Sequence, residues 1–223
     1  STVAYSFLTA AAANVIQAFG TAEQKQRFLP HMFSGRFSGT MALTEPNVGS
    51  SLGDLTTKAI PQADDQYLIK GQKMFISGGD QDITENIVHL VLARIQDAPQ
   101  GVKGISLFIV PKFRTHLDGT LAEANDVQLA GLLHKMGYRG TTSTVLNFGE
   151  QDTCLGYLIG EAGSGLKYMF KMMNEARVGV GLGAAMIGYR GYLESLEYAK
   201  QRPQGRLATE RNPNSKPVNI IEH

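Results

Sequence analysis

Two short segments carry the residues whose types and spacing could do chemistry. MALTEPNVGSS (residues 41–51) and KGQKMFISGGD (residues 70–80) each read as an extended run that ends in small polar residues. Strand ends of this kind can bring backbone N–H groups and hydroxyls up to a bound ligand. The alternative is that both are ordinary strand ends followed by turn-forming residues, and composition alone does not decide between the two interpretations.

The chain between these segments predicts how they meet. TTKAIPQADDQYLIKG reads as two strands around a turn at residues 62–65, so the two segments can come together in one sheet.

Before the two segments, apolar residues at helical spacing predict a helix over residues 4–18. Thr21 and Gln24 have the spacing of a capping box, which predicts a second helix that ends near Pro30.

From about residue 37 the periodicity becomes that of strands separated by turn residues, which predicts an antiparallel β-barrel or sandwich. The predicted strands cover residues 39–44, 55–61, 66–69, 73–77, 86–94, 105–110, 126–129, 142–148 and 154–159. The helical period returns from residue 163 to residue 202, a run that needs partner helices to bury its apolar side. The fold class is therefore α+β, divided at residues 1–36, 37–162 and 163–223.

The bulk composition excludes several classes of protein. With 223 residues, 43% hydrophobic and 18% charged, the chain can bury a core. A net charge of +1 gives no reason to expect nucleic acid or an anionic membrane as partner. The single Cys154 excludes an internal disulfide, and no apolar run approaches the ~20 residues of a membrane span. A single free thiol suits a reducing compartment, and we expect a cytoplasmic protein. The chain lacks an initiating Met and stops at NIIEH, so we also expect that it is cut at both ends.

Six pieces in order, GTMALTEPNVGSS, GQKMFISGGD, KGISLFIVPKF, HKMGYRG, GEAGSGLKYMFKMMNEAR and YAKQRPQGR, resemble the acyl-CoA dehydrogenase family in content and spacing. The resemblance covers almost the whole chain, and FISGGDxxxTENIVHLVLARI looks like the bacterial branch that contains 3-methylmercaptopropionyl-CoA dehydrogenases. It implies the end of an N-terminal helical domain, a middle β domain that binds FAD, and the first long helix of a C-terminal helical bundle.

The resemblance also implies roles on the flavin for the first segment. The backbones of Met41 and Leu43 and the hydroxyl of Thr44 would address the pyrimidine edge of the isoalloxazine. Gly49 and Ser50 form the turn that would meet the pyrophosphate, and Ser50 would also border the substrate. The alternative for Thr44 is a strand-end hydroxyl bonded to nearby backbone.

The second segment would form the other side of the flavin site, through Phe75, Ile76 and Ser77. Phe75 stands where many members of the family carry Trp, and it keeps an apolar face but lacks the indole N–H. Ser77 would donate a hydrogen bond near N5. The alternative for Phe75 is an ordinary core aromatic.

The resemblance assigns substrate contacts to the long helix. Asn174 and Arg177 would line the acyl-CoA channel, and Arg177 can at the same time be a helix-surface residue paired with a neighbouring acid. The catalytic Glu of some members directly precedes the helix Arg, where this chain has Ala176. Glu175 is rotated by about 100° from that position and is the weaker candidate. We therefore expect the base beyond His223 and no catalytic residue in this chain.

Two further patterns concern phosphate binding. Arg202 and Gln204 resemble a turn that reaches the flavin pyrophosphate of a neighbouring subunit, but the turn reads Pro-Gln-Gly here, and a solvated basic helix end is the competing interpretation. The G-x-G-x-x-A run at residues 179–184 lacks the strand that a dinucleotide site requires.

The five histidines have no metal-ligand spacing, and His89 is expected to be a satisfied core or interface imidazole.

The function that the resemblance implies is α,β-desaturation of an acyl-CoA thioester, as in fatty acid β-oxidation, with hydride transfer to flavin N5 and electrons passed to an electron-transfer flavoprotein. A homodimer or homotetramer is expected. The alternatives are an acyl-CoA oxidase and a non-catalytic, flavin-binding regulatory or nucleic-acid-associated protein on the same scaffold. The 223-residue chain alone is expected to be inactive.

Overall fold

The computed structural model describes residues 3–63 and 65–223. It divides into two compact units, Ser1–Ala176 and Arg177–His223. The first unit contains two N-terminal helices, all the strands and the first turns of the long helix α3 (Gly165–Gln201). The α+β fold class is therefore confirmed.

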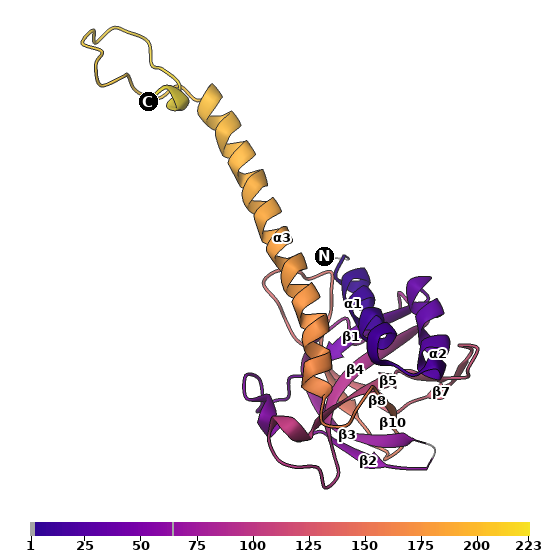
Figure 1. Ribbon diagram of the computed structural model, residues 1–223. Helices are drawn as coiled ribbons and strands as arrows, with labels where there is room; N and C mark the ends of the chain where they lie inside the picture. Colours follow the sequence, from indigo (N-terminus) through magenta and orange to yellow (C-terminus); the bar gives the residue numbers. More distant parts are fainter. Residues whose placement is uncertain (1–2, 64) are drawn as a thin grey trace. The chain divides into compact units, whose positions relative to one another are not determined.

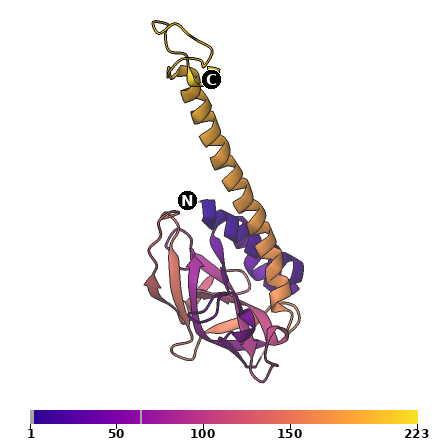
Figure 2. The same ribbon diagram turned by 90° about the vertical axis from the view of Figure 1, so that its left-hand side faces the viewer.

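Helices α1 (Val3–Phe19) and α2 (Ala22–Phe33) lie on the same side of the strands, as Figures 1 and 2 show. A row of small and apolar side chains on α1, among them Ala12 and Ile16, is fully buried. Strand β1 (Phe37–Ala42) passes close beneath, because Gly39 has no side chain there. A Cβ on Gly39 would lie 2.7 Å from the Cβ of Ala12. Close packing of helix on strand thus depends on this glycine.

The capping box that begins α2 is confirmed. The Gln24 N–H donates to the Thr21 hydroxyl, and the Thr21 N–H donates to the Gln24 side chain, both at 3.1 Å. The predicted end near Pro30 is wrong, because the helix continues to Phe33. Proline removes one hydrogen bond within a helix, but burial of the apolar side chains around it, including Met32, keeps the last turn packed.

The main sheet has eight strands in the order β1-β4-β5-β10-β3-β9-β8, with β2 pairing both β3 and β4. The strands besides β1 are β2 (Lys58–Pro61), β3 (Gln66–Ser77), β4 (Asn86–Ile95), β5 (Ile105–Pro111), β8 (Val127–Leu132), β9 (Ser143–Phe148) and β10 (Leu155–Leu158). Short 3₁₀ turns η1 (Leu52–Asp54) and η2 (Val102–Gly104) lie in the loops, and η3 (Ile220–Glu222) lies in the second unit.

The sequence predicted a wholly antiparallel arrangement, and the sheet differs from it in two places. Both β1 and β2 pair with β4 in parallel, and the remaining pairs are antiparallel. The long connection between β1 and β4 makes the parallel pairing possible, since parallel neighbours need a crossover. The predicted strands at residues 66–69 and 73–77 are one continuous strand, β3. The small hairpin of β6 (Phe113–Thr115) and β7 (Leu121–Ala124) was not predicted.

The turn predicted at residues 62–65 falls partly on Asp64, which lies outside the described residues. On either side of it the Gln62 N–H donates to the Gln66 carbonyl at 2.8 Å, which joins the ends of β2 and β3.

The long helix predicted from residue 163 to residue 202 is confirmed as α3. In the first unit its first turns bury Tyr168, Met169 and Met172 against the core, whereas Phe170 is exposed. In the second unit, many apolar side chains of α3 are exposed, including Val178 and Ile187. The three-domain division at residues 36 and 162 stays a prediction. No helix among the described residues is long and apolar enough to cross a membrane.

Candidate functional site

The two segments singled out in the sequence meet directly. Strand β1 ends at Ala42, and the chain then turns between Glu45 and Val48, which exchange backbone hydrogen bonds of 2.9 and 3.1 Å. The Met74 N–H of β3 donates to the Thr44 carbonyl at 2.9 Å. The end of the first segment is therefore held against the middle of the second.

A β-bulge marks this meeting point. The pairing of β3 with β9 shifts register between Lys73 and Ile76. Phe75, within the bulge, has a φ of 59° and is 60% exposed. Positive φ strains a bulky residue, and bulges and strained residues of this kind are concentrated beside functional sites. The alternative that Phe75 is an ordinary core aromatic is wrong, because the bulge turns its ring outward.

The neighbours of Phe75 take up different environments. The side chain of Ile76 is buried, so only its backbone could meet a ligand, and Ser77 is half-buried at the end of β3. On the first segment, Thr44 is half-buried and Leu43 is buried. The residues near the bulge thus present one exposed ring with hydroxyl side chains on the two neighbouring segments.

Other predicted residues lie further along the first segment. Met41 is half-buried within β1, and Gly49 and Ser50 are exposed in the turn that follows Val48. The contacts of the described residues link Thr44 to the bulge but do not extend this link to Ser50. The role of Ser50 in the same site therefore stays a prediction.

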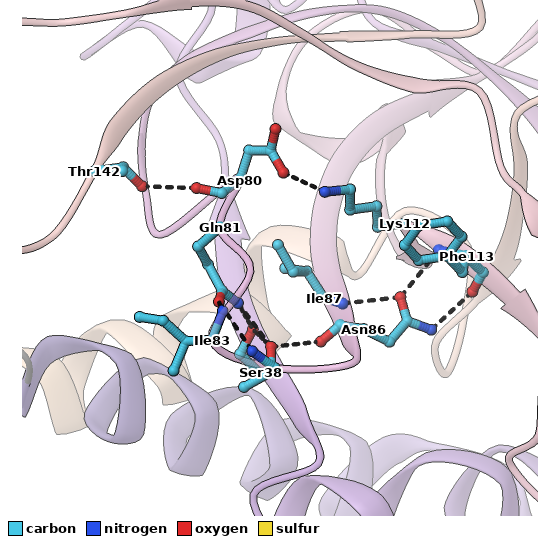
Figure 3. A network of polar contacts seen from close by, with 10 residues as sticks. Ser38, Asp80, Gln81, Ile83, Asn86, Ile87, Lys112, Phe113 and Thr142 are labelled. Atoms are coloured by element: carbon cyan, nitrogen blue, oxygen red, sulfur yellow. Dashed lines mark hydrogen bonds and ion pairs between the residues drawn. The ribbon is translucent and has the colours of Figure 1, made fainter.

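The loop that follows β3 is held by a polar network, shown in Figure 3. The Thr142 hydroxyl donates to the Asp80 carbonyl at 3.1 Å, and the Asp80 carboxylate pairs with Lys112. The Gln81 amide donates to the Ser38 hydroxyl at 2.9 Å. Three different parts of the chain therefore fix Asp80 and Gln81 in the loop after Ser77.

Sequence reasoning missed an ion pair directly beneath the bulge. Lys73 Nζ lies 2.9 Å from Glu45 Oε1, and the two side chains are 0% and 3% exposed. Burial raises the pKa of Glu45, but the charge of Lys73 and hydrogen bonds from Thr57 and Thr56 outweigh it and lower this pKa to about 2. Burial lowers the pKa of Lys73 to about 8, against the opposing effect of Glu45. Both groups are therefore charged at neutral pH.

A signal for this pair was present in the sequence. Strand β3 buries Ile69 and Lys73, two positions an even number apart, so Lys73 points inward. An inward-facing Lys on a strand requires a buried acceptor, and buried charges are almost always paired.

The residues predicted on α3 are placed differently. Glu175 Oε2 accepts a hydrogen bond of 3.0 Å from the Asn14 amide of α1. Asn174, beside it, is exposed. Arg177 and Arg202 belong to the second unit, as does Gln204, whose N–H donates to the Val218 carbonyl at 2.8 Å. The run at residues 179–184 lies within α3, so the dinucleotide pattern lacks its strand and carries no such site.

Metal and thiol chemistry find no support in the described part of the chain. No group of three or more metal-ligating side chains occurs there. Burial raises the pKa of the Cys154 thiol far above its usual range.

His89 is a core imidazole, as expected, with Nδ1 2.8 Å from the Thr40 hydroxyl. Its Nε2 is buried without a partner in the described residues, so it is satisfied on one side only.

The residues around the bulge fit an isoalloxazine. A flavin needs an apolar wall and hydrogen-bonding groups near its edge and N5. The exposed Phe75 ring supplies the first, and the Thr44 and Ser77 side chains supply the second.

Cavities are found elsewhere, including one of about 510 Å³ between α1 and the end of α2 and one of about 700 Å³ beside the start of α2.

Comparison with known proteins gives a consistent result. The family model for the acyl-CoA dehydrogenase middle domain matches residues 40–150, and the model for the N-terminal domain matches residues 1–36. A butyryl-CoA dehydrogenase of Syntrophomonas wolfei is 45% identical over 100% of this chain and 37% of its own length. A 3-methylmercaptopropionyl-CoA dehydrogenase of Ruegeria pomeroyi is 45% identical over 89% of this chain and 33% of its own length.

Among solved structures, butyryl-CoA dehydrogenase from Megasphaera elsdenii is similar with a TM-score of 0.70 and 27% identity, over 89% of this chain and 48% of that one. The chain thus spans about a third of the length of the curated relatives quoted above, at 37% and 33%.

Proposed function

Because the chain belongs to the acyl-CoA dehydrogenase family, whose members depend on FAD, we propose that the whole protein desaturates an acyl-CoA thioester between Cα and Cβ. The observation that supports this proposal most directly is the bulge that turns the Phe75 ring outward beside Thr44 and Ser77. FAD, when bound, supplies the acceptor for the hydride that leaves Cβ.

The residues of this chain have distinct roles in the proposal. The Phe75 ring packs against the isoalloxazine, and backbone groups at Met41, Leu43 and Ile76 meet its edge. The Thr44 and Ser77 hydroxyls donate hydrogen bonds to it. In a dehydrogenase of this kind, such donors stabilise negative charge where it develops during the reaction.

Further residues contact the more distant parts of the ligands. Gly49 and Ser50 bind the pyrophosphate, and Arg202 and Gln204 reach the pyrophosphate of a neighbouring copy in a homodimer or homotetramer. Asn174 and Arg177 contact the acyl-CoA, with Arg177 on its pantetheine or nucleotide part.

The catalytic base lies beyond His223 in this proposal. The hydrogen bond from Asn14 to Glu175 supports it, since a structural partner on α1 already occupies that carboxylate. The base must remove the Cα proton while the thioester oxygen accepts hydrogen bonds, which makes that proton acidic.

The proposal is tested on the whole protein. We expect this protein in the cytoplasmic extract, from which it is purified. Purified protein should carry bound FAD with visible absorbance and should reduce a dye with one or more acyl-CoA thioesters. The screen begins with butyryl-CoA and 3-methylmercaptopropionyl-CoA, the substrates named in two relatives that are each 45% identical. Absence of both flavin and activity with every thioester would reject the proposal.

Two alternative functions, an acyl-CoA oxidase and a non-catalytic flavin-binding protein, are distinguished by identifying what accepts the electrons. Transfer to an electron-transfer flavoprotein without peroxide supports a dehydrogenase, whereas peroxide in air supports an acyl-CoA oxidase. Bound FAD without turnover would favour the flavin-binding regulatory or nucleic-acid-associated protein, which a net charge of +1 disfavours.

A further inference from the structure

The proposed function leaves the buried ion pair of Glu45 and Lys73 without a role. Their charged atoms are 2.9 Å apart, and the side chains are 3% and 0% exposed. Removing two charges from water costs about as much as their attraction returns, and apolar replacements of similar volume are often as stable or more stable. Stability alone therefore does not explain the pair.

The Glu45 carboxylate joins the turn after β1 to the chain that enters β2. Its Oε2 accepts hydrogen bonds from the Thr56 N–H and hydroxyl, both at 2.7 Å. Its Oε1 accepts from the Thr57 N–H at 3.0 Å and from the Thr57 hydroxyl at 2.6 Å. Five donors, including Lys73, thus converge on one carboxylate, which fixes its position.

The Lys73 ammonium joins the same turn to the bulge of β3. Besides the bond to Glu45, Nζ donates to the Leu43 carbonyl at 2.9 Å. The next residue along the chain, Met74, donates its N–H to the Thr44 carbonyl at 2.9 Å. Phe75 follows at once, with its positive φ. One side chain and one backbone bond therefore hold Leu43 and Thr44 at a fixed place beside the Phe75 ring.

We propose that Glu45 and Lys73 are positioning residues, which hold the Leu43–Thr44 backbone and the Phe75 bulge as one preformed edge for the flavin. This inference rests on the proposed function. Neither residue touches the ligand in this account, since both are buried beneath the edge. Their effect is to avoid the cost of ordering two separate segments when the ligand binds.

The test is the double variant Glu45→Gln, Lys73→Met in the whole protein, which removes both charges together so that no lone charge is buried. We expect the Kd for FAD to rise about tenfold. The absorption bands and midpoint potential of the flavin bound to the folded variant should shift, a readout that a general loss of stability would not change.

A matched control is present on the same strand. Lys70 and Asp152 form an exposed ion pair of 2.7 Å, with side chains 54% and 67% exposed. The double variant Lys70→Met, Asp152→Asn also removes two opposite charges, but from the surface. Its FAD affinity, flavin spectrum and midpoint potential should equal those of the wild type.

The outcomes separate this inference from the proposed function. A wild-type protein that binds no FAD would reject both. A wild type that binds FAD, with a double variant unchanged in affinity, spectrum and potential, would overturn the positioning role alone. If the double variant does not fold, Thr57→Val replaces it, since this change removes only the 2.6 Å hydroxyl bond to Glu45. We expect a weaker loss of FAD affinity in that variant, and an unchanged affinity would overturn the role.

Discussion

His89 shows how a single residue can set the acid limit of this fold. It lies fully buried on β4 with Nδ1 against the Thr40 hydroxyl and Nε2 unpartnered in the described residues. Burial and, to a smaller extent, the nearby charge of Lys112 lower its pKa to about 3, against the opposing effect of Asp80. The folded protein therefore keeps this imidazole neutral through the whole range in which an exposed imidazole gains a proton.

The sign of the pH effect follows from this difference. The unfolded chain binds a proton at His89 near pH 6.5, whereas the folded chain does so only near its lowered pKa of about 3. Folding stability is therefore lost as the pH falls between these values. We expect His89→Leu to remove about 2–3 kcal/mol of the loss in unfolding free energy between pH 7 and pH 4.5.

Urea unfolding across this pH range measures the slope. The leucine variant also leaves the Thr40 hydroxyl without its partner, which lowers stability by a constant amount at every pH, so the slopes and not the absolute values are compared. The same measurement on His134→Leu, which replaces an exposed imidazole, is the control. Parallel curves for wild type and His89→Leu would contradict the prediction.

At the scale of elements, the two halves of β3 pair with different strands. Its first half pairs with β2 and β10, and its second half pairs with β9 across the bulge. Thr57, the residue directly before β2, lies close against Gly71. The position of Thr57, and through it that of the Glu45 carboxylate, therefore depends on the missing side chain at residue 71.

We expect Gly71→Ala to lower the unfolding free energy by about 1–3 kcal/mol, because overpacking forces backbone shifts. The new Cβ would lie 2.5 Å from the Thr57 hydroxyl and 2.8 Å from the Thr57 Cα. Denaturant unfolding provides the measurement.

The control for this variant is Gly131→Ala in β8, where a Cβ would meet nothing within 4 Å. Its unfolding free energy should stay within about 0.5 kcal/mol of the wild type, as for an ordinary surface substitution. Equal losses at the two glycines would show that the approach of Thr57 is not the cause.

At the scale of the whole molecule, the two units differ in how their surfaces are covered. The first unit buries a continuous core from α1, the sheet and the first turns of α3. The second unit contains most of α3, where Val178, Leu182 and Ile187 are among many exposed apolar residues. A helix with exposed apolar residues on several sides is stabilised by packing against other helices.

Hydrogen exchange would distinguish the two units. In the 223-residue chain by itself, amides of α3 beyond Arg177 should exchange much faster than amides of β4 and β5. In the whole protein the same amides should become protected, because additional helices would cover them. Equal exchange of the helix in both samples would contradict the expected C-terminal bundle.

The local features of this protein could be read from its sequence. The capping box of Thr21 and Gln24, the two helical regions and most strands depend on near neighbours in the chain, and the structure confirms them. The ordered motifs were also sufficient to indicate the family, which the family models confirm. Such features are visible because turn residues, caps and hydrophobic periods act over a few residues.

The tertiary structure alone decided the features that carry the site. The parallel pairing of β1 with β4, the outward turn of Phe75 and the burial of Lys73 against Glu45 each join residues far apart in sequence. The even spacing of Lys73 from Ile69 indicates that Lys73 faces inward, but Gly71 interrupts the apolar alternation, and the one strand β3 was predicted as two. Which charge pairs with which, and where a strand bulges, is settled by burial and hydrogen bonding between distant segments, and no local period records that choice.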